Sequence, residues 1–125
     1  NSPLHLINEK EMLTNVNIFL NELKKGNDID LMKINNIWLH NGLAWIINLL
    51  QKWAYELLLC KLSEGYKYFP NDIKAVHKLA LNADLSKLLT YQKSLNTIKS
   101  YAQTSVNKEI NLNSVMIEYK KIFTD

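Results

Sequence analysis

The longest apolar segment of the chain lies between Gly42 and Leu62. Its apolar residues recur at the three- and four-residue spacing of an α-helix. Further apolar residues widen this stripe until only a narrow polar strip is left. A helix that is apolar on most sides is covered by neighbouring elements, so the sequence predicts a central buried helix over about residues 42–62. The stripe consists of Leu43, Ile46, Ile47, Leu50, Trp53, Ala54, Leu57 and Leu58.

Helical periodicity also recurs on both sides of this segment, with no strand-like alternation over four residues outside it. Asn41-Gly42 fits either a break between two helices or a kink in one, and we prefer two helices. The pattern predicts an all-α fold, a compact bundle of five to six helices around the central one, in a single domain over residues 1–125. The other helices are expected over residues 4–25 (regular from Asn8), from Asp28 or Asp30 to His40, from Asn71 or Asp72 to Leu81, over 85–106, and over 112–123.

The composition agrees with one helical domain and argues against sequence-specific reading of nucleic acid. The chain has 125 residues, with three glycines and two prolines, which favours long helices over many short strands. Its net charge is +3, and all fifteen cationic residues are Lys. Arg is the residue that forks onto phosphates and guanines. Loose attraction of lysines to a phosphate backbone is left open.

The number of cysteines and the first residues of the chain indicate the cellular compartment of the protein. Cys60 is the single cysteine, so no disulfide can form within the chain, which favours a cytoplasmic protein. The first 20 residues lack the pattern of a signal peptide. The central segment is interrupted by Gln51, Lys52 and Glu56, which argues against a membrane span. The chain begins at Asn1 without an initiator Met, as expected for a fragment of a longer subunit.

We find no constellation of residues that predicts catalysis, a metal site or a cofactor. His5, His40 and His77 lie far apart without a second ligand at metal-binding spacing. Cys60 is expected to be a small buried residue and His77 a half-buried one. No phosphate-binding glycine motif occurs, so we expect no enzyme activity in this domain. Glu56 is either part of the polar strip of the central helix or the partner of a Lys on another helix.

Three aromatics, Tyr66, Tyr68 and Phe69, cluster next to Lys61 and Lys67. They fit three interpretations: aromatics that pin a loop onto the bundle, a stacking platform for single-stranded nucleic acid, or a patch that binds protein. The candidate partner-binding residues are Trp38, Tyr66, Tyr68 and Phe69.

Several motifs follow one another along the chain: Trp53-Ala54-Tyr55-Glu56-Leu57-Leu58-Leu59, a loop with Tyr68 and Asn71-Asp72, Leu79-Ala80, and Asn107-Lys108-Glu109-Ile110-Asn111-Leu112 leading to Val115-Met116 and Tyr119. Their order resembles the C-terminal domain of the delta prime subunit of bacterial DNA polymerase III, over most of the chain. That family carries a W-x-x-D-L-L pattern in its central helix and an N-x-x-L-x-L-E-x-L-L pattern before and within its last helix. Glu56 stands at the aspartate, and Asn113 replaces the usual glutamate. The collar domains of gamma/tau and delta are related alternatives. The matching residues are Trp53, Glu56, Leu57, Leu58, Asn107, Ile110, Leu112, Val115 and Met116.

This resemblance implies a role in DNA replication. Delta prime is a component of the clamp loader of the DNA-directed DNA polymerase III holoenzyme, which uses ATP to open the sliding clamp and place it on primed DNA. Its C-terminal domain joins those of delta and gamma/tau in a five-membered collar. We therefore expect an oligomerisation domain without a cofactor, whose partners are gamma/tau and delta, with DNA contacted only through the complex and no membrane. Such contacts join two different faces to two neighbours and bury on the order of 1,200–2,000 Å² each. The alternative is a small helical domain that binds single-stranded nucleic acid.

Overall fold

The computed structural model describes residues 2–62, 65–102, 104 and 106–123, and the side chains of all of these except residues 2–9, 12, 38 and 40. Within these ranges the chain forms six α-helices and no strand, which confirms the all-α prediction. The helices are α1 (Ser2–Leu23), α2 (Leu31–Asn41), α3 (Leu43–Lys61), α4 (Ile73–Asn82), α5 (Leu85–Lys99) and α6 (Lys108–Lys121), with short 3-10 helices η1 (Gly26–Asp28) and η2 (Pro70–Asp72).

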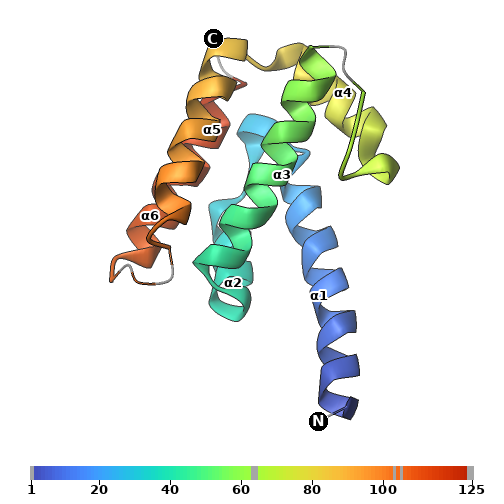
Figure 1. The fold of residues 1–125 in the computed structure, drawn as a ribbon, viewed down its shortest axis with the longest axis vertical. Coiled ribbons are helices and arrows are strands. Elements are labelled where there is room, and N and C mark those ends of the chain that lie inside the picture. The colour runs from blue at the N-terminus through green and yellow to red at the C-terminus, as the bar shows by residue number, and fades with distance from the viewer. Residues whose placement is uncertain (1, 63–64, 103, 105, 124–125) are drawn as a thin grey trace.

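The predicted central helix is α3, which packs along α4 and α5 and meets α2 at its start (Figure 1). Trp53 on α3 is completely buried, together with Leu50 and Leu57 one turn to either side. Burying a large apolar side chain stabilises the fold by roughly 1.5–3 kcal/mol. Because α3 supplies more such residues than any other described helix, it organises the core. Its buried residues are Leu43, Ile46, Ile47, Leu49, Leu50, Trp53, Ala54, Glu56 and Leu57.

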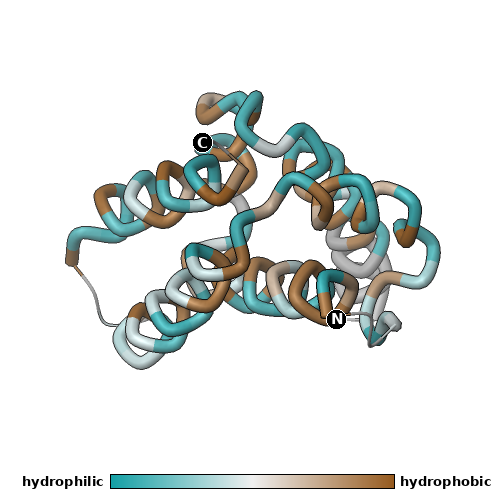
Figure 2. The backbone as a smooth tube through the Cα atoms, turned by 90° about the horizontal axis from the view of Figure 1, so that it is seen from above, coloured by the Kyte–Doolittle hydropathy of each residue, from teal (hydrophilic) through white to brown (hydrophobic). Residues whose placement is uncertain are grey.

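The other helices add buried apolar residues to the same core, and apolar and polar positions are interspersed along them (Figure 2). The C-terminal part of α1 contributes Phe19 and Leu23 to the core, and Phe19 lies against the half-buried ring of Trp45, with centroids 6.0 Å apart. The first turns of α1 extend beyond the other helices (Figure 1). The last helix, α6, packs against α5 and η1 and buries Met116 and Tyr119.

Local polar groups fix several helix boundaries. Asp30 starts α2, because its Oδ1 accepts a hydrogen bond from the backbone N–H of Met32 at 2.9 Å; this selects Asp30 over Asp28. Gly42 has φ +86° between α2 and α3, a conformation that favours glycine, which confirms two helices at this point. Asp84 accepts from the N–H of Ser86 at the start of α5.

Three predicted boundaries were wrong. The helix expected over 85–106 ends at Lys99. Beyond it the Ser100 hydroxyl donates to the carbonyl oxygen of Thr97 at 2.6 Å, and the backbone forms turns whose hydrogen bonds join residues three apart. The helix expected from Leu112 begins at Lys108, and α1 is helical from Ser2 rather than from Asn8. Hydrophobic periodicity follows the buried face of a helix, so it does not register an exposed or half-buried first turn such as residues 108–111 of α6.

Candidate interaction surfaces

Glu56 holds the aromatic loop that follows α3. Its side chain is 1% exposed, and its two oxygens accept the backbone N–H groups of Lys67, at 2.6 Å, and Phe69, at 2.9 Å. Both sequence interpretations of Glu56, as part of a polar strip and as the partner of a lysine side chain, are therefore wrong. The carboxylate is directed at the loop backbone, which fixes the positions of the side chains between its two partners.

The loop aromatics divide into an inward and an outward set. Phe69 is half-buried with its ring edge-on to Trp53, the centroids 5.4 Å apart, so it pins the loop onto the bundle. Tyr68 points outward and lies edge-on to Tyr55 of α3 at 6.0 Å. Tyr66 is 57% exposed. The pinning interpretation thus holds for Phe69, while Tyr66 and Tyr68 are available at the surface.

Lysines surround the outward rings. The Nζ of Lys67 lies 5.2 Å from the ring centroid of Tyr68 and 5.8 Å from that of Tyr55, and the Nζ of Lys52 lies 5.7 Å from Tyr68. These distances are within cation–π range. Lys61, by contrast, is directed away, because its Nζ donates to the carbonyl oxygen of Ala80 on α4.

Lys52, Tyr55 and Tyr68 border a groove of about 460 Å³ between α3 and α5, which we call the α3/α5 groove. Two side-chain amides tie its walls together: Gln51 Nε2 donates to Asn96 Oδ1 at 2.6 Å, and Gln92 Nε2 donates to the carbonyl oxygen of Gln51. Its described lining residues are Asn48, Gln51, Lys52, Tyr55, Leu58, Tyr68, Gln92, Asn96 and Lys99.

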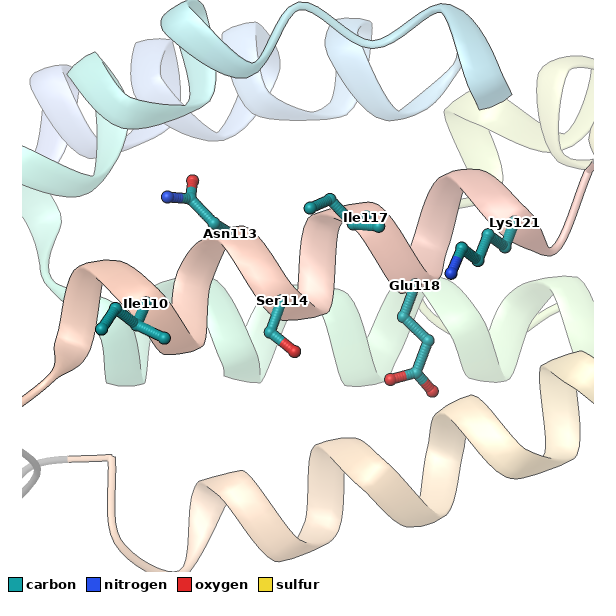
Figure 3. Close-up of a pocket in the computed structure, with 6 residues that line it drawn as sticks. All are labelled: Ile110, Asn113, Ser114, Ile117, Glu118 and Lys121. Carbon is teal, nitrogen blue, oxygen red and sulfur yellow. The ribbon is translucent and has the colours of Figure 1, made fainter.

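A second surface is the outer side of α6, shown in Figure 3. Ile110 and Ile117, two turns apart, are 66% and 44% exposed, and they border a depression of about 510 Å³. At one edge the Glu118 carboxylate accepts a hydrogen bond from Ser94 of α5. A helix apolar on opposite sides is typical of one covered on both. The described lining residues are Ile110, Asn113, Ser114, Ile117, Glu118 and Lys121.

The outer side of α2 is a third exposed apolar surface. Met32 and Leu39, also two turns apart, are 77% and 71% exposed. Trp38, the predicted partner-binding residue on this helix, has a side chain outside the described residues.

Most of the motif residues meet in the core. The Trp53 Nε1–H donates to the Tyr119 hydroxyl at 2.9 Å, and that hydroxyl donates to the carbonyl oxygen of Leu23 at 2.8 Å. Leu57 and Leu112 are completely buried, whereas Leu58 is half-buried. Asn107 immediately precedes α6. Ile110 is not a core residue, because it lies on the side of α6 opposite Leu112.

Two buried phenols belong to this core. Burial raises the pKa of Tyr119 far above its ordinary value, although the hydrogen bond from Trp53 opposes the shift. Burial, with smaller contributions from Tyr119 and Glu118, also raises the pKa of Tyr91 well above the usual range. The Tyr91 hydroxyl donates to the carbonyl oxygen of Val115 at 2.8 Å. Both phenols are thus neutral structural donors rather than acids poised for proton transfer.

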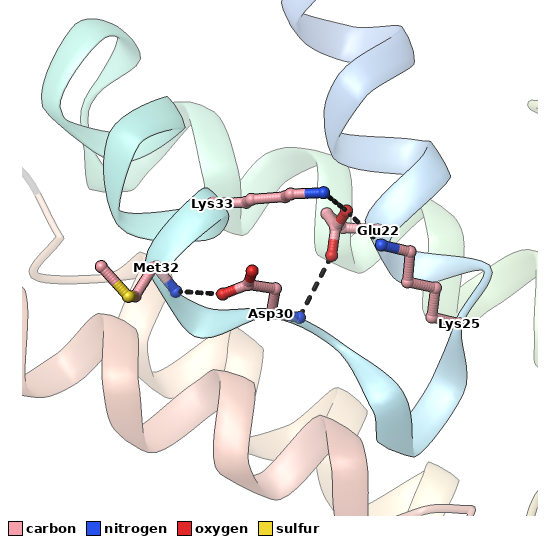
Figure 4. Close-up of polar contacts among 5 residues, drawn as sticks. All are labelled: Glu22, Lys25, Asp30, Met32 and Lys33. Atoms are coloured by element: carbon pink, nitrogen blue, oxygen red, sulfur yellow. Dashed lines mark hydrogen bonds and ion pairs between the residues drawn. The ribbon is translucent and has the colours of Figure 1, made fainter.

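Sequence reasoning missed a second buried carboxylate, Glu22, at the end of α1 (Figure 4). Its oxygens accept from Lys25 Nζ at 2.8 Å and from the backbone N–H of Asp30 at 3.1 Å, and Lys33 Nζ lies 3.7 Å away. Desolvation raises the pKa of Glu22, but these partners outweigh it and the pKa is lowered. The available signal was a glutamate placed just before Lys24-Lys25-Gly26.

Cys60 and His77 lie together, contrary to the sequence prediction that treated them separately. Cys60 is half-buried rather than buried, His77 is exposed, and Sγ lies 3.5 Å from Nδ1. The side chains of His5 and His40 are outside the described ones. Among the side chains that the structure describes, no group of three or more His, Cys, Asp or Glu is placed to hold a metal ion.

Over the described part of the chain, none of the helices combines the length and the apolar character needed to cross a membrane. Comparison with known proteins found no matching family model, no matching curated protein and no matching solved structure.

Proposed function

We propose that this chain is an assembly domain, the C-terminal collar domain of the delta prime subunit of the bacterial DNA polymerase III clamp loader, whose partners are the gamma/tau and delta subunits. The outer side of α6 is the observation that carries this proposal. Ile110 and Ile117 are exposed although the same helix buries Leu112 and Met116 on its other side. The described part of the chain covers only one side of this helix, and a partner would cover the other.

The geometry of the motif residues supports the same proposal. Trp53 and Tyr119 come from the two segments that resemble the delta prime family, and their side chains form a direct hydrogen bond. Glu56, at the aspartate position of the first motif, uses its carboxylate to hold the following loop. An aspartate carboxylate supplies the same acceptor type, so the Glu56 substitution is compatible with the motif.

The first prediction tests the proposed partner. Alone, the chain should elute from size exclusion as a monomer or a weakly associated species, and at tens of micromolar it should co-elute with the C-terminal region of gamma/tau. The double substitution Ile110→Lys, Ile117→Lys should weaken this complex by about 30- to 900-fold, the effect of losing roughly 2–4 kcal/mol at an interface centre.

A matched control is Leu81→Lys on α4, since Leu81 is 71% exposed and lies outside the α6 surface. It should leave the complex intact. Circular dichroism should report the same helix content for both variants, because exposed substitutions change stability by less than about 0.5 kcal/mol. Absence of any elution shift at tens of micromolar, or full binding by the double variant, would contradict the proposal.

A further inference from the structure

We propose that the α3/α5 groove binds single-stranded nucleic acid, with bases stacked on Tyr68 and Tyr55 and phosphates held by Lys52, Lys67 and Lys99. This goes beyond the proposed assembly role and does not depend on it. The described residues that line the groove are all different from those that line the outer surface of α6. One surface can therefore bind its ligand whether or not the other does.

The rings are both available and fixed in place. Tyr55 and Tyr68 are 37% and 39% exposed, and they lie edge-on to each other at the mouth of the groove. Tyr55 is carried by α3, and Tyr68 lies between the two loop residues whose N–H groups Glu56 accepts. Glu56 is thus a positioning residue for the loop. Stacking on ordered aromatic rings is tolerant of base identity, because every base has a π-face.

The charge of the groove is complementary to a phosphate backbone. Lys52 and Lys99 line it, and Lys67 lies over both tyrosine rings. None of the described lining residues is acidic. Glu56 follows the lining residue Tyr55 in the sequence, but its carboxylate is buried and accepts hydrogen bonds from the loop backbone. An entering base would displace an ammonium group from a ring, and that group could then pair with the adjacent phosphate.

The other residues that line the groove carry side-chain amides, and they bear on which base sequences the groove would accept. Asn48, Gln51, Gln92 and Asn96 offer side-chain amides that can hydrogen-bond to base edges. The Gln51–Asn96 bond links the α3 and α5 walls of the groove. From Gln92 to Lys99 the α5 wall is about 10 Å long, at 1.5 Å per residue. The chain contains no Arg, so we expect little discrimination between sequences.

An acidic peptide fits this groove less well than a nucleic acid strand. Peptide recognition in grooves relies on apolar anchors, and Leu58 is the only aliphatic side chain among the described lining residues. The exposed surface of the groove is instead made of phenol rings, amides and ammonium groups. These are the groups that single-strand binding proteins use.

The test is fluorescence anisotropy of the intact chain with labelled 15-mers of oligo(dT) and oligo(U). We expect dissociation constants between about 1 and 100 µM, in the range of non-specific binding. The logarithm of the affinity should fall with the logarithm of the salt concentration at a slope of about −2, from three lysines at roughly −0.7 each. Binding of either oligomer supports the site, and the ratio between the two identifies the preferred strand.

Substitutions distinguish binding in the α3/α5 groove from non-specific attraction of nucleic acid to the positive charge of the whole chain. Tyr68→Ala should weaken binding by about 5- to 150-fold, the effect of losing one stacked base, whereas Tyr68→Phe should retain it. Tyr66→Ala is the matched control in the same loop, because Tyr66 does not line the groove. Lys99→Gln, on an exposed helix position away from the loop, should reduce the slope to about −1.4, while Lys93→Gln on the same helix should not.

The proposal is overturned by any of three results. The first is no binding of either oligomer at 100 µM chain. The second is binding that Lys99→Gln and Lys93→Gln change equally, or that Tyr66→Ala and Tyr68→Ala change equally. The third is binding of poly-glutamate as tight as that of oligo(dT), which would identify the groove as a plain site for acidic chains.

Discussion

The carboxylate of Glu56 shows how one buried side chain determines the conformation of a loop. Two backbone N–H groups, of Lys67 and Phe69, converge on its oxygens from the loop between α3 and η2. Their spacing of two residues turns the side chain between them, that of Tyr68, outward, and Phe69 inward onto Trp53. A hydrogen bond to a charged acceptor contributes about 1.5–3 kcal/mol, more than a neutral one.

Glu56→Gln should therefore destabilise the chain and loosen the loop. The amide keeps one acceptor oxygen and places an N–H₂ donor against a backbone N–H, so one hydrogen bond is lost. We expect the free energy of unfolding in urea to fall by about 1.5–3 kcal/mol, and trypsin to cleave after Lys67 faster. Glu118→Gln is the control, because an amide oxygen can still accept from Ser94. Equal stability of the two variants would contradict this role.

Between elements, Glu22 joins the end of α1 to the start of α2. It reaches Lys25 beyond its own helix, the backbone of Asp30, and Lys33 on α2. The pKa of Lys25 is raised by its hydrogen bond to Glu22, against a smaller opposing effect of desolvation. The junction is thus held by one carboxylate with cations on both sides.

This junction makes stability depend on pH in a defined direction. Because the pKa of Glu22 is lower in the folded chain, its stabilising effect is complete above the pKa of the unfolded carboxyl, about 4.3, and is lost as pH falls through the folded value. The difference in unfolding free energy between the native chain and Glu22→Gln should be constant from pH 6 to 8 and shrink below about pH 4.5. Urea titrations at pH 3.5, 5 and 7 measure it. A difference that grows toward acid would refute the assignment.

The elements show which parts of the fold the sequence could predict. Periodicity located α3 correctly, because burial on nearly all sides leaves a repeated apolar signal. It overextended α5, because buried apolar residues continue through Ala102 although the helix ends at Lys99. It identified the aromatic loop as a candidate site but could not place Glu56 under it, since a carboxylate in a polar strip and one aimed at a loop look alike in sequence. The grouping of Lys52, Tyr55 and Lys99 needed the packing of α3 on α5.

Across the whole molecule, the Tyr119 hydroxyl connects three helices. It accepts from Trp53 of α3, 66 residues away in sequence, and donates to Leu23 at the end of α1, 96 residues away. These separations explain why no local pattern predicted the network. A buried donor or acceptor left without its partner costs about 1–3 kcal/mol. The Tyr119 hydroxyl satisfies one donor and one acceptor, so its loss should lower the free energy of unfolding strongly.

Replacing single tyrosines by phenylalanine should lower the free energy of unfolding by an amount that depends on how many buried groups lose their hydrogen-bond partner. Tyr119→Phe leaves both the Trp53 N–H and the Leu23 carbonyl unpaired and should lower the free energy of unfolding by about 2–4 kcal/mol. Tyr91→Phe leaves only the Val115 carbonyl, with an expected loss of about 1–2 kcal/mol. Tyr101→Phe, at an exposed position, should change it by less than about 0.5 kcal/mol. Urea unfolding measures all three, and any other order would contradict the network.

The position of Tyr119 in the last helix also has a consequence for synthesis. A ribosome adds about 5–20 residues per second, and Tyr119 follows Trp53 by 66 residues. The nascent chain therefore spends about 3–13 s with the indole of Trp53 made but its phenol partner not yet translated. Because α3 leaves the ribosome before α6, a chaperone or a neighbouring nascent chain then meets an apolar helix that the finished protein hides.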